Sequence, residues 1–111
     1  MDPDSLIVVS ITTPVENAEE IAKHLVDNRL AACVNIVPRI RSVYRWEGKV
    51  EEDDESLLLV KTTRFMFSNV SSAVREKHPF AVPEILATPV AECYQGYSRW
   101  VCENVRSCED D

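Results

Sequence analysis

The residue types most capable of chemistry gather in one short stretch, EKHPFAVPEILATPV, at residues 76–90. His78 and Glu84 lie six positions apart there, with Pro79 and Pro83 between them. Imidazole and carboxylate groups are ligands for borderline divalent ions, so the pair is a candidate metal site. The alternative interpretation is structural, because a last-turn histidine interacts with the helix dipole and a glutamate at a strand start is simply solvated. Spacing alone favours the structural interpretation.

Other catalytic patterns are absent from the chain. Its only glycines, Gly48 and Gly96, exclude a P-loop and a dinucleotide fingerprint, and no G-x-S-x-G or H-E-x-x-H motif occurs. A Cys/His pair would need His78 or His24, and His24 falls at the edge of a polar helix face. We therefore expect no enzyme, and the missing glycine-rich anion loop also disfavours an acylphosphatase-like one.

The four cysteines form no C-x-x-C pair, so neither a zinc knuckle nor a thioredoxin-like motif is predicted. In a reducing compartment they are expected to be free thiols. Cys33 lies in an apolar run and is predicted to be a core residue, and Cys108, beside the acidic tail, is predicted to be exposed.

Length and charge restrict the classes of partner. A chain of 111 residues predicts a single domain, 1–111, with a core at about 6–105 and an acidic tail at 106–111. Nineteen Asp and Glu against 12 Lys and Arg give a net charge of −7, which disfavours nucleic acid as a partner. The first residues include no basic region, and no apolar run approaches the roughly 18 residues of a membrane span. We expect a cytoplasmic protein with no membrane insertion.

Hydrophobic periodicity predicts the elements that must position these residues. LIVVSITT, residues 6–13, is typical of a strand buried on both faces. An amphipathic helix follows, with a capping box formed by Thr13 and Glu16. After two further strands, a second helix ends at Pro79, EILATPV is a fourth strand, and a closing helix follows Gly96. This order predicts an α+β, ferredoxin-like βαββαβ antiparallel sheet with an appended C-terminal helix.

The second and third strands, residues 33–46 and 49–62, form a hairpin around a turn at Glu47 and Gly48. A two-residue turn makes paired positions sum to 95, which sets Arg41 opposite Asp54. The acidic run EEDDE is therefore interpreted as half of a cross-strand charge ladder rather than as a metal trap. Alternation with period two also predicts one shared apolar face, made of Val34, Ile36, Ile40, Tyr44 and Trp46.

The lengths of these strands predict a partner. Each strand would run about 45 Å, whereas a covering helix of about fourteen residues spans only about 21 Å. The hairpin must outrun the helices and leave apolar residues and bare strand edges uncovered at its tip. The residues concerned are Val43, Tyr44, Trp46 and Val50. Another copy of the same chain is the simplest cover.

Several stretches carry a family resemblance: LAACVNIVP, WEGKVEEDDE, VKTT, HPFAVPEI and YSRWV, in this order. Over about residues 6–105 the chain resembles the CutA divalent-cation-tolerance family. The resemblance implies a ferredoxin-like subunit in a homotrimer whose hairpins extend the sheets of neighbouring subunits. It also implies a role in the response to divalent metal ions, with copper binding in some members and no established catalytic reaction.

The resemblance implies a copper-ligand set whose three positions hold Ile11, Lys77 and Glu84 here. Only Glu84 keeps its type, and His78 lies beside Lys77. Because Cu(I) prefers thiolates, a weak site for copper or another divalent cation at His78 and Glu84 is the expectation, with no required cofactor. Two alternatives stay open. One is a small-molecule or signalling trimer with a cleft lined by Tyr97, Trp100, Arg39 and Arg41, and the other is a structural scaffold.

Overall fold

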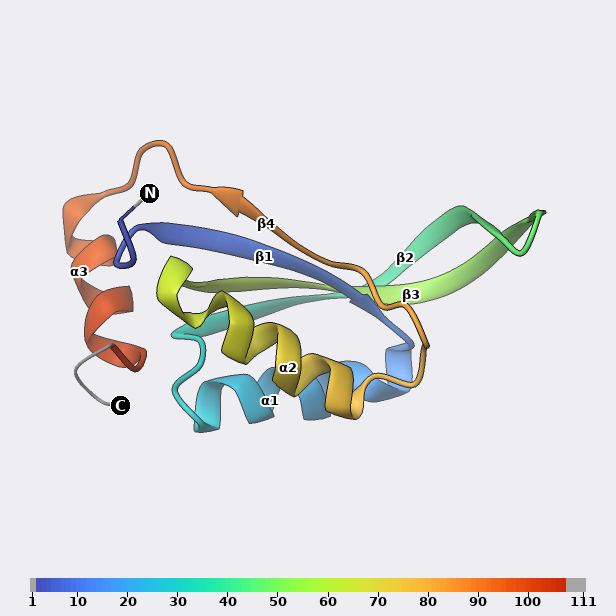
Figure 1. The fold of residues 1–111 in the computed structure, drawn as a ribbon, viewed down its shortest axis with the longest axis horizontal. Helices are drawn as coiled ribbons and strands as arrows, with labels where there is room; N and C mark the ends of the chain where they lie inside the picture. The colour runs from blue at the N-terminus through green and yellow to red at the C-terminus, as the bar shows by residue number, and fades with distance from the viewer. Residues whose placement is uncertain (1, 108–111) are drawn as a thin grey trace.

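The computed structural model describes residues 2–107, which form one antiparallel sheet and three α-helices (Figure 1). Two short 3-10 turns each lead into a helix. Within these residues, no helix has the length and apolar character needed to cross a membrane. The elements in chain order are β1 (Leu6–Thr13), η1 (Val15–Asn17), α1 (Ala18–Asp27), β2 (Cys33–Trp46), β3 (Lys49–Thr63), η2 (Arg64–Met66), α2 (Phe67–Lys77), β4 (Ile85–Pro89) and α3 (Gln95–Asn104).

The strands lie in the order β2-β3-β1-β4, and every neighbouring pair is antiparallel. Figure 1 shows α1 and α2 side by side under one face of this sheet, with α3 at the end opposite the hairpin tip. This is the predicted ferredoxin-like arrangement with an appended C-terminal helix. The His78–Glu84 stretch therefore connects the helix layer to the edge strand β4.

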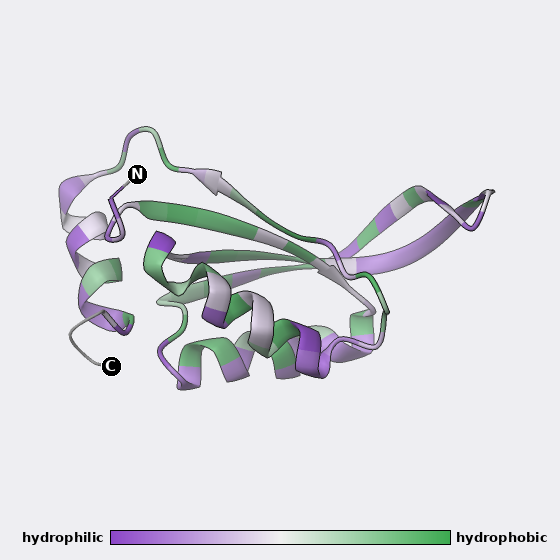
Figure 2. Ribbon diagram, in the orientation of Figure 1, coloured by the Kyte–Doolittle hydropathy of each residue, from purple (hydrophilic) through white to green (hydrophobic). Residues whose placement is uncertain are grey.

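The core lies between the sheet and the two helices. Val9 and Ile11 of β1 pack there with Leu58 of β3, and all three are fully buried. Burial of such a side chain contributes about 1.5–3 kcal/mol, so this layer carries most of the apolar stabilisation. In Figure 2 the helices show hydrophobic stripes, as amphipathic helices should.

Local details correct three expectations. β1 was expected to be buried on both faces, but its residues alternate between buried and half-buried because only one face of the sheet carries helices. The capping box is wrong: neither η1 nor α1 has a side-chain cap, and the Thr13 hydroxyl donates to the Pro14 carbonyl at 3.3 Å. Cys33 is half-buried at the start of β2 rather than in the core. Cys93 and Cys102 are also free thiols, and Cys108 lies outside the described residues.

The hairpin register matches the prediction from Trp46↔Lys49 as far as Ile40↔Glu55. We call this part of the hairpin, residues 40–55, the arm. Between Val37 and Ile40 the register shifts by one residue, because Pro38 and Arg39 together stand opposite Ser56. The Ser56 hydroxyl donates to the Pro38 carbonyl at 2.7 Å and holds this bulge in place.

The bulge overturns the predicted apolar face. An extra residue in one strand reverses the in-and-out alternation, so Ile40, Tyr44 and Trp46 lie on the face opposite Val34 and Ile36. The arm consequently has two distinct faces, and residues paired across the two strands share a face. One carries Tyr44, Trp46 and Glu55, and the other carries Val43, Arg45 and Val50.

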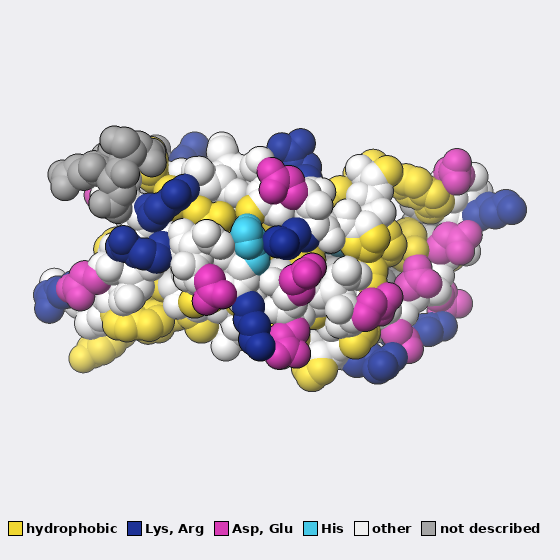
Figure 3. Space-filling view, turned by 90° about the horizontal axis from the view of Figure 1, so that it is seen from below, with side chains coloured by type: hydrophobic (Ala, Val, Ile, Leu, Met, Phe, Trp, Pro, Cys, Tyr) yellow, Lys and Arg dark blue, Asp and Glu magenta, His cyan; other side chains and the backbone are white. Residues whose placement is uncertain are grey.

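The arm extends past the helix layer, as the strand lengths predict (Figure 1). Val43 and Val50 are each 63% exposed, and Tyr44 and Trp46 are also exposed. Seen from the helix side, hydrophobic side chains lie among acidic ones at this end of the molecule (Figure 3). The described chain thus presents an apolar surface that its own helices leave uncovered.

The tip of the arm is the place where backbone conformation is most demanding. Glu47 has φ of 50° and Gly48 has φ of 80°, the double left-handed geometry of a tight hairpin turn. We expect Gly48→Ala to lower the free energy of unfolding by about 1–2 kcal/mol, because a Cβ strains this conformation. No heavy atom lies near the added Cβ, so the cost is that of the backbone alone. Urea denaturation at fixed protein concentration measures it.

The matched variant for this prediction is Glu47→Asn, since asparagine tolerates the left-handed region better than glutamate. It should raise the free energy of unfolding or leave it unchanged. Equal losses in both variants would contradict the backbone explanation.

Candidate functional site

His78 follows the last residue of α2 and is only 7% exposed. Its Nε2–H donates to the Thr12 carbonyl at 2.7 Å, and its Nδ1 accepts from the Phe80 amide at 3.1 Å. These partners fix the neutral tautomer with the proton on Nε2. The ring also lies against Phe80, with 5.0 Å between the ring centroids. His78 therefore ties the end of α2 to β1 and to the segment that follows.

Glu84 lies in a different environment, exposed immediately before β4. Nothing in the structure tests whether it shares a ligand with His78, and the pair stays a prediction. Among residues 2–107 no group of three or more His, Cys, Asp or Glu side chains is placed to hold a metal ion. Ile11, in the position of the implied thiolate, is fully buried and Lys77 is half-buried. The donor set therefore does not fit a tight copper site.

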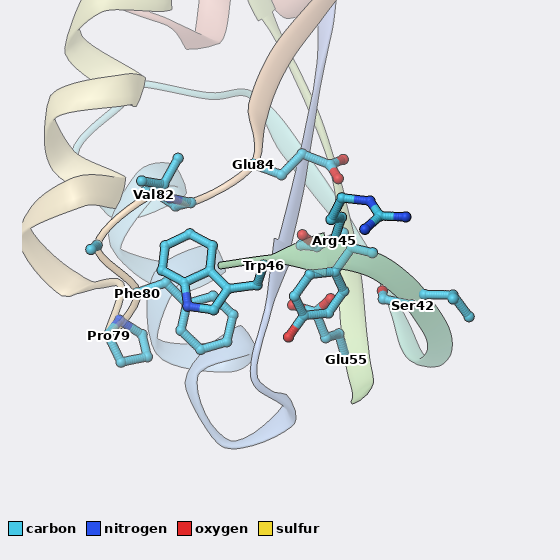
Figure 4. A pocket seen from close by; sticks show the side chains of 13 residues that line it. Ser42, Arg45, Trp46, Glu55, Pro79, Phe80, Val82 and Glu84 are labelled. Atoms are coloured by element: carbon cyan, nitrogen blue, oxygen red, sulfur yellow. The ribbon is translucent and has the colours of Figure 1, made fainter. Parts of the chain in front are cut away.

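A pocket with a volume of about 780 Å³ lies beside this segment. One wall is made by residues 42–46 of the arm and the other by residues 79–84, with Thr12 and Glu55 between them. In Figure 4, Trp46 lies on the same side as Phe80 and Val82, whereas Arg45, Glu55 and Glu84 lie on the other side. The pocket thus has an apolar part and a charged part.

Glu55 is the residue of this site that the sequence analysis missed. It is 5% exposed, yet its carboxylate accepts no hydrogen bond and forms no ion pair within residues 2–107. Because it belongs to the run EEDDE, the sequence analysis interpreted Glu55 as a solvent-exposed member of the cross-strand charge ladder. The only sequence feature that could have indicated a change of face in the hairpin was Pro38, since prolines inside strands mark edges or bulges.

Two other acids of the run, Glu52 and Asp54, form the predicted cross-strand ladder. Arg41 pairs with Asp54 at 3.1 Å and with Glu52 at 3.4 Å, and Arg39 also reaches Asp54 at 2.9 Å. The hydrogen bond from Arg41, followed by that from Arg39, lowers the pKa of Asp54 below its ordinary value. All these groups are exposed, so the ladder sets the register more than it stabilises the fold.

Tyr44 lies on the pocket face of the arm and donates its hydroxyl proton to Asp53. This hydrogen bond, with the nearby negative charges of Asp53, Glu55 and Glu51, raises the pKa of Tyr44 to about 12. The phenol therefore stays protonated at neutral pH, and its ring is an uncharged aromatic surface beside a row of carboxylates.

The alternative cleft with Tyr97 and Trp100 stays a prediction. Their rings stack at 5.6 Å on α3, which Figure 1 places at the end of the molecule opposite the arm tip. The ladder arginines Arg39 and Arg41 belong to the hairpin. A cleft lined by all four would need residues from a neighbouring copy.

The geometry defines a class of protein: a ferredoxin-like subunit with an arm longer than its helix layer and a helix closing the other end. The family model for the CutA1 divalent ion tolerance protein matches residues 7–104. The divalent-cation tolerance protein CutA of Thermus thermophilus is 55% identical over 98 residues, covering 87% of this chain and 95% of that protein. The chain belongs to the CutA1 divalent ion tolerance family.

Two further comparisons agree with that assignment. The solved structure of the Cut A1 divalent cation tolerance protein from Thermus thermophilus has a TM-score of 0.89 and 53% identity, covering 91% of this chain and 99% of that one. A relative from Arabidopsis thaliana, "Protein CutA, chloroplastic", is 41% identical over 102 residues. These cover 91% of this chain but only 56% of the plant protein.

The position of His78 leads to a stability prediction. His78→Phe keeps the apolar contacts of the ring but leaves the Thr12 carbonyl and the Phe80 amide without their partners. We expect the free energy of unfolding to fall by about 1–3 kcal/mol, the cost of stranding buried polar groups. Urea denaturation at neutral pH measures the change.

His24→Phe is the matched control, because His24 is half-buried on α1 and its Nδ1 hydrogen-bonds the exposed side chain of Asn28 at 3.2 Å. It should change the free energy of unfolding by less than about 0.5 kcal/mol. Equal effects at both histidines would show that the two hydrogen bonds of His78 contribute nothing particular.

Proposed function

We propose that this chain is a non-enzymatic protein of divalent metal ion tolerance and homeostasis that works as a cytoplasmic homotrimer. The observation that carries the proposal is the arm, a long apolar and charged hairpin that the chain's own helices leave uncovered. Its membership of the divalent ion tolerance family supports a role in the tolerance of divalent metal ions. The three free thiols among the described residues support a reducing compartment.

Assembly is the part of this proposal that the geometry supports most directly. Val43 and Val50 are the most exposed apolar residues of the arm and share one face of it. Burying them against a second copy removes apolar surface from water, and the strand edges there can extend a neighbour's sheet. The number of copies, three, is what the resemblance to the family implies.

The metal-binding part of the proposal is a weak site at His78 and Glu84. The carboxylate of Glu84 is exposed, but Nδ1 of His78 can coordinate an ion only after the Phe80 amide has left it. Losing that hydrogen bond reduces affinity, which suits a low-affinity borderline divalent ion such as copper(II) or zinc rather than a resident cofactor.

The assembly is tested with Val43→Lys. Position 43 stands opposite Glu52, so the new charge pairs across the strands and keeps the arm folded. Burying a lysine between subunits is costly, and we expect the molar mass measured by light scattering to fall to that of the single chain. Val26→Lys, on the exposed side of α1, is the matched control and should keep the wild-type mass. A monomeric wild type at micromolar concentration would contradict the proposal.

The metal site is tested by calorimetric titration of Cu²⁺ and Zn²⁺ into the wild type, Glu84→Ala and His78→Ala. We expect weak binding to the wild type and a loss of heat in both variants. Circular dichroism must first show that His78→Ala is folded, because that ring also has a structural role. Glu92→Ala, an exposed carboxylate between β4 and α3, is the control. Unchanged binding in both site variants would remove this pair as the ligands.

A further inference from the structure

The pocket between the arm and residues 79–84 holds a charge that the described chain leaves uncompensated. Glu55 is more than nine-tenths buried, lines the pocket, and has no hydrogen-bond donor or cationic partner among residues 2–107. The Glu55 oxygens are not among the fully buried unpaired atoms of these residues, so they open into the pocket. A largely buried carboxylate without a partner is costly, and proteins keep such groups where a ligand or metal meets them. Glu55 is therefore the feature of the pocket that points to a ligand.

The arginine that lines the pocket forms no ion pair with this carboxylate. Arg45 lines the pocket, but it pairs with Val50 and lies on the opposite face of the arm from Glu55. In Figure 4 its side chain lies on the same side of the pocket as Glu84. Glu84 is exposed, so the buried charge among the lining residues of the pocket is the single negative charge of Glu55.

The remaining walls are aromatic and apolar. Trp46 and Phe80 lie together on one side in Figure 4, with Pro79 and Val82 beside them. Tyr44 adds a third ring on the same face of the arm as Glu55. Aromatic faces attract cations, most strongly where water is excluded, and they also bury apolar groups.

We propose that this pocket binds a small organic cation, an ammonium group on an apolar body, with the ammonium at Glu55 and the body against Trp46 and Phe80. The volume of about 780 Å³ lies within the range of small-molecule sites. The net charge of −7 favours the approach of a cation to the protein. Val50, on the other face of the arm, does not line this pocket, whereas Val43 borders both the pocket and the interface proposed above.

Three soluble probes of matched size test the charge preference: protonated phenethylamine, 2-phenylethanol and 3-phenylpropionate, each in phosphate buffer free of other amines. Quenching of Trp46 fluorescence reports binding in a Trp100→Phe background, because Trp100 is the other tryptophan and lies on α3. We expect the amine to bind about tenfold or more tightly than the alcohol, and the carboxylate not to bind. Equal affinity for amine and alcohol would overturn the proposal.

Glu55→Gln is the decisive variant, since it keeps the shape of the side chain and removes the charge. Amine affinity should fall by about tenfold or more, to the level of the alcohol. Glu51→Gln, an exposed position on the same strand and face, is the matched control and should change affinity less than about twofold. Equal losses of amine affinity in the two variants would indicate attraction by the overall negative charge of the arm. They would contradict binding of the ammonium group at Glu55.

Thermal unfolding separates a ligand site from a contact between subunits. Without ligand, Glu55→Gln should unfold at the wild-type temperature or above it and keep the wild-type molar mass, because an uncompensated charge has been removed. If the variant instead dissociates while phenethylamine never binds the wild type, a neighbouring copy supplies the partner of Glu55. That result would overturn the ligand proposal and leave the proposed assembly standing.

Discussion

The bulge at Pro38 and Arg39 is the constraint on which the rest of the arm depends. Proline offers no N–H to the ladder, and the chain accommodates this by inserting one extra residue opposite Ser56. Beyond that point the alternation of side chains is reversed. Without the reversal, Tyr44 and Trp46 would face away from Glu55 of β3, and the pocket beside residues 79–84 would lose its aromatic arm wall.

Much of the fold could be predicted from the sequence because it depends on local signals. The Glu47–Gly48 turn sets the register of the arm, and the arginines of β2 pair with the acids of β3 as that register requires. The strand lengths alone predict that the arm extends past the helices. The predicted alternation, by contrast, continues straight through Pro38, although proline within a strand is a sign of a bulge.

The site was less predictable because its properties come from residues far apart in the chain. His78 was interpreted from its neighbours in sequence, yet its Nε2 is bound by the carbonyl of Thr12, 66 positions away. Glu55 was one of five consecutive acids, and it is surrounded by β2 side chains that the bulge turns to its face and by residues 79–84. Local pattern predicts which residues carry charge. It does not predict which of them loses contact with water.

The segment from His78 to Glu84 links the two proposed sites through one hydrogen bond. Nδ1 of His78 holds the Phe80 amide, and Phe80 forms part of the apolar wall of the pocket. A cation coordinated at Nδ1 must release that amide, so metal binding would free the backbone that positions Phe80. By linkage, an organic cation that holds Phe80 in place would weaken metal binding by the same free energy. A divalent ion and an ammonium ligand would then oppose each other through the conformation of this short segment, even without sharing a ligand atom.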